Sequence, residues 1–243
     1  MLVLHDWVLR TERVAVHWPS RTAIVADLHL GYAEARCRRG EAVPEESTTA
    51  LLEPLHRVLQ EHVAQRLVVA GDLLEDADCH EALAAFVSWC QQSRLKEVAL
   101  VPGNHDAGLE MPLGAKSLLT FHPEGFVLDG WRIVHGEGRL PTGPLIHGHE
   151  HPWLRWSPKS RAIRPRFAGS RIAPAAIDGP CYLSGPERLI LPAYSTEAAG
   201  VNILSLPRRR SFRCHVIAGD NVVDVGDVAT LRTRLSVAYG KIG

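Results

Sequence analysis

The sequence predicts one α/β domain in which two β-sheets pack on each other and are flanked by helices. Strand-like and helix-like segments alternate over residues 22–101, a pattern typical of parallel strands joined by crossover helices. After residue 121 the helical pattern gives way to short apolar runs separated by turn residues, which predicts a second sheet. A chain of 243 residues can bury one large core, so we expect residues 1–243 to form a single domain.

The first strands and the first long helix follow from short-range patterns. Residues 13–17 and 22–26 are rich in β-branched and apolar side chains and flank a turn, so both are predicted strands. A helix is predicted to begin at Pro44, with acids in its first turn and apolar residues recurring on one face. Pro54 lies inside this pattern and is expected to kink or restart the helix, because proline lacks the required amide hydrogen.

The middle of the chain completes the alternation. Residues 67–70 and 98–101 are predicted strands, and a helix over residues 80–92 connects them. We therefore expect these two strands to run parallel.

The second half is predicted to be mainly β. Three short strands are expected over residues 126–128, 131–134 and 144–146. Residues 181–183 and 189–191 predict two further strands joined at Ser184 and Gly185. Residues 208–210, three consecutive arginines, are interpreted as a turn between strands.

Five of the predicted strands end in side chains that commonly bind metal ions. In chain order these ends are Asp27-Leu28-His29, Gly71-Asp72, Asn104-His105-Asp106, His135-Gly136 and His147-Gly148-His149-Glu150-His151. Open α/β sheets bind ligands at the carboxyl ends of their strands, so we expect all five ends to converge on one sheet edge. If the backbone stays extended, Asp27 and His29 point the same way. A single Asp-x-His pair is weak evidence, and the repetition gives the prediction its weight.

Composition limits the class of protein. Lys and Arg together number 27, as do Asp and Glu, so the chain is not a strongly basic nucleic-acid-coating protein. Five cysteines, with no Cys-x-x-Cys pair, predict reduced thiols in a cytoplasmic protein. We expect neither a signal peptide nor a membrane-spanning helix, because an acid, Asp6, already follows Met1 to His5 and no apolar run approaches about 20 residues.

The candidate ligands are carboxylates, imidazoles and an amide, without a thiolate. Such a set suits Mn, Fe, Zn, Ni or Co better than calcium or a structural zinc. The candidates exceed what one tetrahedral ion needs, which favours two divalent ions that share a carboxylate. Two neighbouring ions can activate water and hold phosphoryl oxygens, so the set predicts phosphoester hydrolysis. The candidates are Asp27, His29, Asp72, Asn104, His135, His149 and His151.

In order and type, the five strand-end motifs resemble those of the calcineurin-like metallophosphoesterases. The resemblance implies a four-layer α/β/β/α sandwich with two mixed sheets, and two divalent ions, with Mn expected first. It implies that Asp72 bridges the ions, that His105 stabilises the transition state or protonates the leaving oxygen, and that Asp106 orients the His105 ring. The implied ligands are Asp27, His29 and His151 for the first ion and Asn104, His135 and His149 for the second.

Further motifs resemble the bacterial ligase-associated DNA damage response phosphoesterases of the PdeM type. These motifs are Asp27-Leu28-His29-Leu30-Gly31, Arg38-Arg39-Gly40 with Val43-Pro44, and Leu191-Pro192-Ala193-Tyr194. The resemblance implies a phosphodiester substrate, DNA, and a role in DNA repair beside a DNA ligase, a helicase and an exonuclease. The sequence itself contains no docking motif for these partners.

Two basic stretches bear on the substrate. Residues 32–40 predict either phosphate contact or a solvated basic face, and the face is the simpler interpretation. Residues 153–178, which resemble an insertion, interleave arginines with aromatic residues. This composition fits nucleic-acid contact or, more simply, a proline-rich basic loop.

Three functions therefore stay open. The first is a DNA-directed phosphodiesterase, that is, a nuclease. The second is a hydrolase of small phosphoesters such as nucleotides or lipid-linked diphosphates, and the third is a non-catalytic interaction module of a repair complex. The His105-Asp106 pair argues against the third, because a structural metal site needs no acid.

Overall fold

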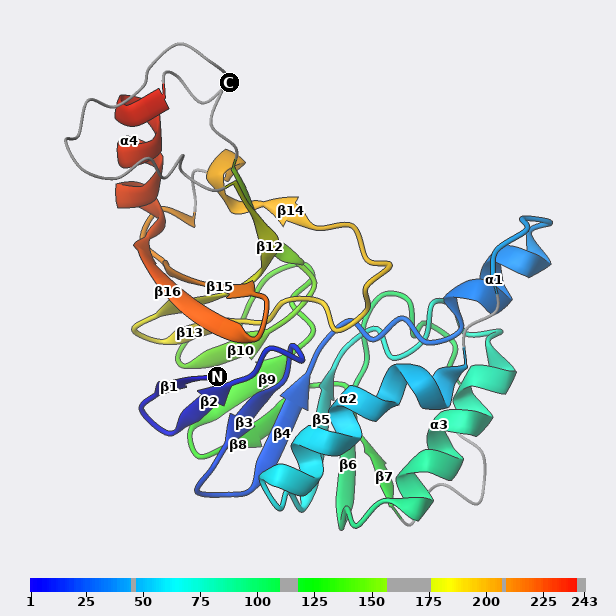
Figure 1. The fold of residues 1–243 in the computed structure, drawn as a ribbon. Coiled ribbons are helices and arrows are strands. Elements are labelled where there is room, and N and C mark those ends of the chain that lie inside the picture. Colours follow the sequence, from blue (N-terminus) through cyan, green and yellow to red (C-terminus); the bar gives the residue numbers. More distant parts are fainter. Residues whose placement is uncertain (45–46, 110–117, 157–175, 207–208, 240–243) are drawn as a thin grey trace.

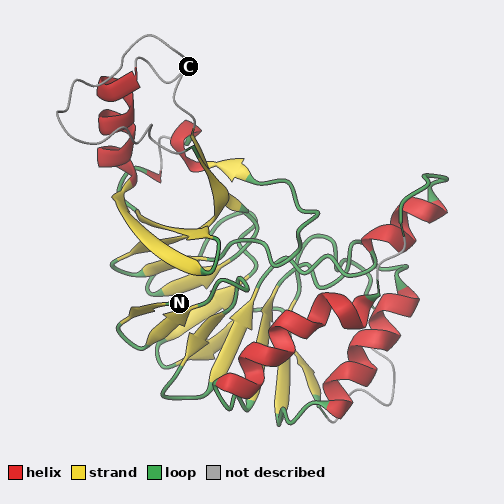
Figure 2. Cartoon of the chain, viewed as in Figure 1, coloured by secondary structure: helices red, strands yellow, loops and turns green. Residues whose placement is uncertain are grey.

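The computed structural model describes residues 1–44, 47–109, 118–156, 176–206 and 209–239. Two mixed β-sheets pack face to face, and helices α2 (Thr48–Glu61) and α3 (His80–Gln92) cover the outer face of the first sheet (Figure 1). Among the described residues, the second sheet is accompanied by a single helix, α4 (Val228–Tyr239), and a short 3-10 turn (Figure 2). The predicted α/β class and two-sheet core are confirmed.

The first sheet has seven strands in sequence order. Strands β1 to β4 pair antiparallel and strands β4 to β7 pair parallel. Helices α1 (Tyr32–Arg38) and α2 connect β4 to β5, and α3 connects β5 to β6. The predicted parallel pairing through crossover helices is therefore confirmed. The strands are β1 (Leu2–Leu4), β2 (Trp7–Leu9), β3 (Ala15–His17), β4 (Thr22–Val25), β5 (Arg66–Ala70), β6 (Glu97–Val101) and β7 (Leu119–Phe121).

The second sheet has nine strands, with the order β14-β11-β12-β13-β10-β9-β8 and with β15 and β16 continuing from β12. Its centre is parallel, because β10 runs in the same direction as both β9 and β13. The strands are β8 (Phe126–Leu128), β9 (Trp131–Val134), β10 (Leu145–His147), β11 (Pro152–Trp156), β12 (Ile177–Gly185), β13 (Arg188–Ile190), β14 (Val201–Asn202), β15 (Arg213–Ala218) and β16 (Asn221–Asp227).

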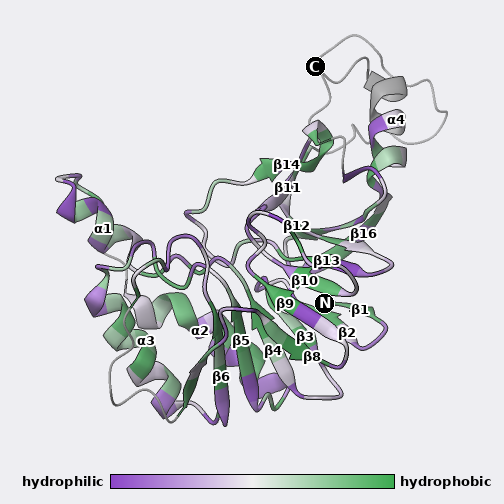
Figure 3. Cartoon of the chain, turned by 180° about the vertical axis from the view of Figure 1, so that it is seen from behind, coloured by the Kyte–Doolittle hydropathy of each residue, from purple (hydrophilic) through white to green (hydrophobic). Residues whose placement is uncertain are grey.

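The central strands of the first sheet are buried on both faces, which is why they are continuously apolar rather than alternating (Figure 3). In β4, Ala23 and Val25 pack under the helices. Ile24 packs in the opposite direction, against apolar side chains of the second sheet. A separate apolar cluster lies on the outer face of the second sheet, where Val228 and Leu231 of α4 contribute.

Helix α2 continues through Pro54, so the predicted restart of the helix is wrong. The hydroxyl of Tyr194 donates to the Leu51 carbonyl at 2.7 Å and accepts the Leu55 N–H at 3.3 Å. It thus lies between two backbone groups that a regular helix joins directly. An inserted side-chain group of this kind accommodates the irregularity that proline introduces. The segment after β13 is thereby tied to α2.

The second half departs from the prediction in two further places. The turn between β12 and β13 lies at Pro186 and Glu187, two residues beyond the predicted Ser184 and Gly185. Helix α4 was not predicted, because its first residues are rich in valine and threonine, which have low helix propensity. None of the described helices has both the length and the apolar character needed to cross a bilayer.

Candidate metal centre

All five predicted ligand-bearing strand ends meet, but they come from two sheets rather than from one sheet edge. Strands β4, β5 and β6 of the first sheet and β9 and β10 of the second present their carboxyl ends to the same region. A backbone bond between the sheets closes this region, as the N–H of Ser195, in the segment after β13, donates to the Asp27 carbonyl at 3.1 Å. The expectation that all five ends share one sheet edge is therefore wrong, although the five predicted segments do lie together.

The ligand-bearing turns have unusual backbone conformations. Asp27, His29 and Asp72 have φ values of 54°, 47° and 50°, and His149 and His151 have values of 64° and 41°. The prediction that an extended backbone aligns Asp27 with His29 is therefore wrong. Non-glycine residues rarely adopt positive φ, and the cost is accepted where surrounding contacts fix a functional geometry.

Glycines beside the ligands allow the close approach of these turns. Gly71 has a φ of +88°, and a Cβ there would lie 2.1 Å from the His135 ring. A Cβ on Gly148 would lie 2.4 Å from the Asp27 carboxylate. Larger residues at either position would displace a candidate ligand.

Asp27, His29 and His151 form the first donor group, with ligand atoms within 4.8 Å of one another. Asp27 is fully buried, and its Oδ2 accepts the His149 backbone N–H at 2.9 Å. The His151 Nε2 lies 3.6 Å from Asp27 Oδ1. Burial lowers the pKa of His151, but the hydrogen bond and charge of Asp27 outweigh burial, and the pKa is raised overall.

Asp72, His135 and His149 form the second group, and Asn104 joins them. The His135 Nε2 lies 3.0 Å from Asn104 Oδ1, 3.0 Å from His149 Nδ1 and 3.3 Å from Asp72 Oδ2. Burial and the neighbouring His135 lower the pKa of His149, which favours the neutral imidazole that binds metals. Asp72 also groups with His29 and His105, so its carboxylate lies between the two donor sets.

These residues fit two divalent cations. The Nε2 atom of His29 is buried and has no hydrogen-bond partner among the described residues. Two imidazole nitrogens, of His135 and His149, face each other at 3.0 Å beside carboxylate and amide oxygens. A cation between such donors satisfies all of them, and the two carboxylates offset its charge. The structure thus brings together Asp27, His29, Asp72, Asn104, His135, His149 and His151.

His105 borders the centre. Its backbone N–H donates to Asp72 Oδ1 at 2.9 Å, and its ring lies 4.8 Å from that of His29, centroid to centroid. The His105 Nδ1 lies 2.6 Å from the Glu75 carbonyl oxygen. Because a carbonyl only accepts, Nδ1 carries the hydrogen and Nε2 is left for other partners.

Asp106 does not orient His105 directly, so this implied role is wrong. Its buried carboxylate instead accepts three backbone N–H groups. Burial raises the pKa of Asp106 despite these bonds. The residue therefore holds together the loops that carry Asp72 and His105. The donors are Gly103 at 2.9 Å, Leu74 at 3.2 Å and Leu73 at 3.3 Å.

Glu75 is a site residue that the sequence analysis missed. Its carboxylate Oε2 lies 3.1 Å from the His29 Nδ1, while its carbonyl holds His105. Burial raises the pKa of Glu75, but the contact with His29 more than offsets it, and the pKa is lowered. A carboxylate on the outer nitrogen of a ligand histidine fixes the ring and increases its basicity. The available signal was an acid three residues after Asp72.

A family model described as calcineurin-like phosphoesterase matches residues 20–175, more than half of the chain, including every predicted site residue. The chain belongs to this family. It is therefore a metal-dependent hydrolase of phosphoesters. The fold is also similar to that of the crystal structure of Pseudomonas putida nuclease MPE, with a TM-score of 0.65 and 22% identity over 90% of this chain and 94% of that chain. No curated protein matches the sequence.

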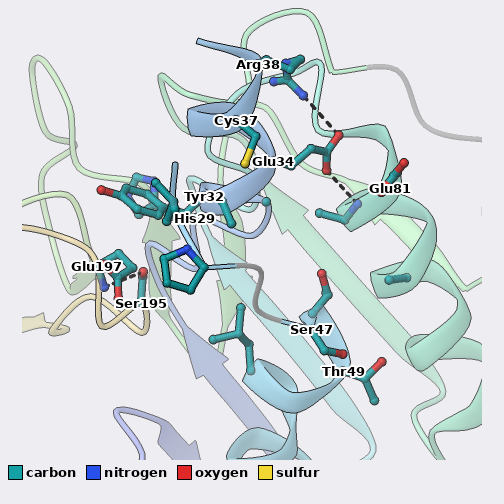
Figure 4. A pocket seen from close by; sticks show the side chains of 18 residues that line it. His29, Tyr32, Glu34, Cys37, Arg38, Ser47, Thr49, Glu81, Ser195 and Glu197 are labelled. Carbon is teal, nitrogen blue, oxygen red and sulfur yellow. Dashed lines mark hydrogen bonds and ion pairs between the residues drawn. The ribbon is translucent and has the colours of Figure 1, made fainter. Parts of the chain in front are cut away.

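In this phosphoesterase the metal centre opens into a cleft of about 1330 Å³, with His29 in its lining (Figure 4). The start of α2, helix α1 and the first turn of α3 form its walls. Among the carboxylate and guanidinium groups of its lining, three are acidic, those of Glu34, Glu81 and Glu197, and one is basic, that of Arg38. We call this the acidic cleft.

The arginines of residues 32–40 lie on α1 and at its C-terminal cap, and acids engage all three. Arg36 pairs with Glu41 at 3.0 Å, and Arg38 pairs with Glu34 at 3.2 Å. Arg39 lies 3.7 Å from Asp76. These contacts support the solvated basic face over the phosphate contact.

The second basic stretch is described only at its ends. Trp153 and Trp156 lie on β11, and the Arg155 Nε lies 3.3 Å from Asp178 Oδ1. Residues 157–175 lie outside the described residues, so nucleic-acid contact there stays a prediction. The cations concerned are Lys159, Arg161, Arg164, Arg166 and Arg171.

Proposed function

We propose that this protein is a dinuclear phosphodiesterase that cleaves nucleic acid. The observation that carries the proposal is the pair of donor groups on either side of the Asp72 carboxylate. Two divalent cations bound there supply Lewis acidity for the phosphoryl group and an activated water. Asp27, His29 and His151 would hold one cation and Asn104, His135 and His149 the other, with Asp72 shared.

His105 has the geometry of a general acid. The Glu75 carbonyl fixes its Nδ1–H, so Nε2 is the atom that gives a proton to the leaving oxygen. Its backbone N–H on Asp72 keeps the ring next to the shared carboxylate. Asp106 secures the loop and takes no part in proton transfer.

Nucleic acid as the substrate is supported by the sequence motifs and by the shared fold of a solved nuclease. The resemblance to PdeM-type phosphoesterases further supports a role in DNA repair, with Mn as the cation and a DNA ligase and a helicase as partners, in the cytoplasm.

A second candidate is hydrolysis of small phosphoesters such as nucleotides or lipid-linked diphosphates. It is favoured by the acidic cleft and by the ion pairs that engage the arginines of residues 32–40, since neither attracts a long polyanion.

The test is a Mn-supplemented assay of purified protein on bis-p-nitrophenyl phosphate, p-nitrophenyl phosphate, and single- and double-stranded DNA. We expect hydrolysis of the diester and of DNA, and its loss in Asp72→Asn. Cleavage of small diesters without DNA would favour the second candidate. Activity on the monoester alone would contradict the nuclease proposal and favour the second candidate. No activity with any divalent metal would point to a non-catalytic module.

A further inference from the structure

A second hollow borders the metal centre at the second donor group, whereas the acidic cleft borders it at His29 of the first. It measures about 500 Å³ and includes His149, a member of the second donor group. We call it the arginine pocket. Its lining is Gly136, Gly138, Leu140, His149, Glu150, Arg188, Arg209 and Phe212.

Arg209 is held rigidly in this pocket. It is 8% exposed, and its Nε donates to Glu150 Oε2 at 2.7 Å while a terminal nitrogen contacts the other Glu150 oxygen. The guanidinium also lies over the Phe212 ring, 5.2 Å from its centroid. A guanidinium has five N–H donors, so this carboxylate uses only part of its capacity. Glu150 thus orients Arg209 and neutralises one positive charge.

Arg188 carries the positive charge of the pocket that Glu150 does not neutralise. It stands at the start of β13, and its side chain donates to the Pro141 carbonyl at 3.4 Å. Among the described residues it has no carboxylate partner. The lining of the arginine pocket therefore carries two guanidinium groups against one carboxylate, the reverse of the acidic cleft.

We propose that the arginine pocket binds a second phosphate of the nucleic-acid substrate, next to the phosphate that is cleaved. The inference rests on the proposed function. His149 belongs both to the second donor group and to the pocket wall, so a bound chain that reaches the metal centre also reaches the pocket. Arginine suits phosphate because its planar donors match the phosphate oxygens. The acidic cleft would receive the uncharged nucleoside portion of the substrate.

The experiment compares the dinucleotide d(TpT) with d(pTpT) and d(TpTp), which add one phosphate on either side. For the metal-loaded enzyme, we expect kcat/KM to be at least about 10-fold higher for one phosphorylated form, equivalent to about 1.4 kcal/mol. Arg188→Ala should reduce this ratio to about one, and Arg188→Glu should reduce it further. Arg132→Ala is the matched control, because Arg132 is an exposed arginine on β9 that, like Arg188, donates to a backbone carbonyl, that of Glu124, and is not in the lining.

Equal kcat/KM for all three dinucleotides, or a preference that survives Arg188→Ala, would overturn the proposal. So would cleavage of bis-p-nitrophenyl phosphate without cleavage of either phosphorylated dinucleotide. If no diester is cleaved, the proposed function fails. The phosphate site in the pocket is then tested separately, by measuring the binding of single-stranded DNA to wild type and Arg188→Ala across a salt series. Removing a phosphate contact should lower the slope of log K against log salt by about one in Arg188→Ala. An unchanged slope would overturn the proposal there.

Discussion

The two sheets contribute different chemistry to one metal centre. The first sheet provides the proposed oxygen donors, Asp27, Asp72 and Asn104, together with His29. The second sheet provides imidazoles alone. The negative charge of the centre therefore comes from one side, and imidazole nitrogens close it from the other. Neither sheet carries a complete ligand set for two ions, so the centre depends on how the sheets pack.

The largest effect is expected from the carboxylate that lies between both donor groups. Asp72→Asn removes the shared negative charge, so we expect kcat/KM to fall by at least about 10³-fold and both ions to be weakly held. His151→Ala removes one imidazole from the second sheet and should leave about one ion per chain. Elemental analysis of both variants checks the difference. If both variants retained two ions per chain, these ligand assignments would be wrong. The different contributions assigned to the two sheets would then be wrong as well.

The next effect separates catalysis from metal binding. His105→Ala should keep both ions and lose about 10²–10⁴-fold in turnover, the usual range for a general acid. The loss should be greater for an alkoxide leaving group than for p-nitrophenolate, which leaves without a proton. Equal losses on the two substrates would refute proton donation by His105.

A smaller effect is expected from Glu75, which supports two histidines through different groups. Glu75→Ala removes the carboxylate beside His29, and we expect metal affinity to fall about 10–100-fold. Its carbonyl stays, so the leaving-group dependence that involves His105 should persist. Glu75→Gln should be milder, because an amide oxygen also accepts the ring hydrogen. Metal titration of each variant measures the affinity. Glu41→Ala is the control, because Glu41 is an exposed acid that pairs with Arg36. Equal affinities for wild type and Glu75→Ala would rule out this support.

The smallest effect concerns stability rather than chemistry. Tyr194→Phe leaves the Leu51 carbonyl and the Leu55 N–H without the bridging hydroxyl, so we expect a loss of about 1–3 kcal/mol in the free energy of unfolding. Urea unfolding of the metal-free protein measures this loss, with Tyr32→Phe as the control. An unchanged unfolding midpoint would show that α2 does not need the bridge.

The same tyrosine predicts an alkaline pH dependence. Burial raises the pKa of Tyr194 to about 12, whereas an unfolded tyrosine has a pKa of about 10. Between these values the unfolded state has already lost its proton, so stability present below pH 10 is lost as the pH rises toward 12. The loss reaches about 3 kcal/mol, because the pKa of this tyrosine differs by about two between the folded and unfolded states. Tyr194→Phe should flatten the slope, and an identical slope in the variant would contradict this account.

Much of the first sheet could be predicted from the sequence, because strands buried on both faces are continuously apolar and the helices between them have a clear period. The candidate ligands could also be named from the sequence, since each lies shortly after the end of a predicted strand, and the structure brings them together. The topology of the site could not, because strand ends do not reveal which sheet they belong to.

The residues that support the site carry no comparable local signal. Glu75 and Arg209 gain their roles from partners that only folding brings near, His29 in one case and Glu150 in the other. The role of Asp106 was misjudged for the same reason, because its neighbour in sequence, His105, is not its hydrogen-bond partner.

The central claim is that the two sheets together hold two divalent ions that share Asp72. Anomalous scattering from crystals of the Mn-loaded protein tests it most directly. We predict two peaks about 3.5–4 Å apart, both in contact with the Asp72 carboxylate. One peak should lie among Asp27, His29 and His151, and the other among Asn104, His135 and His149. A single peak, or a second peak held by other residues, would contradict the claim.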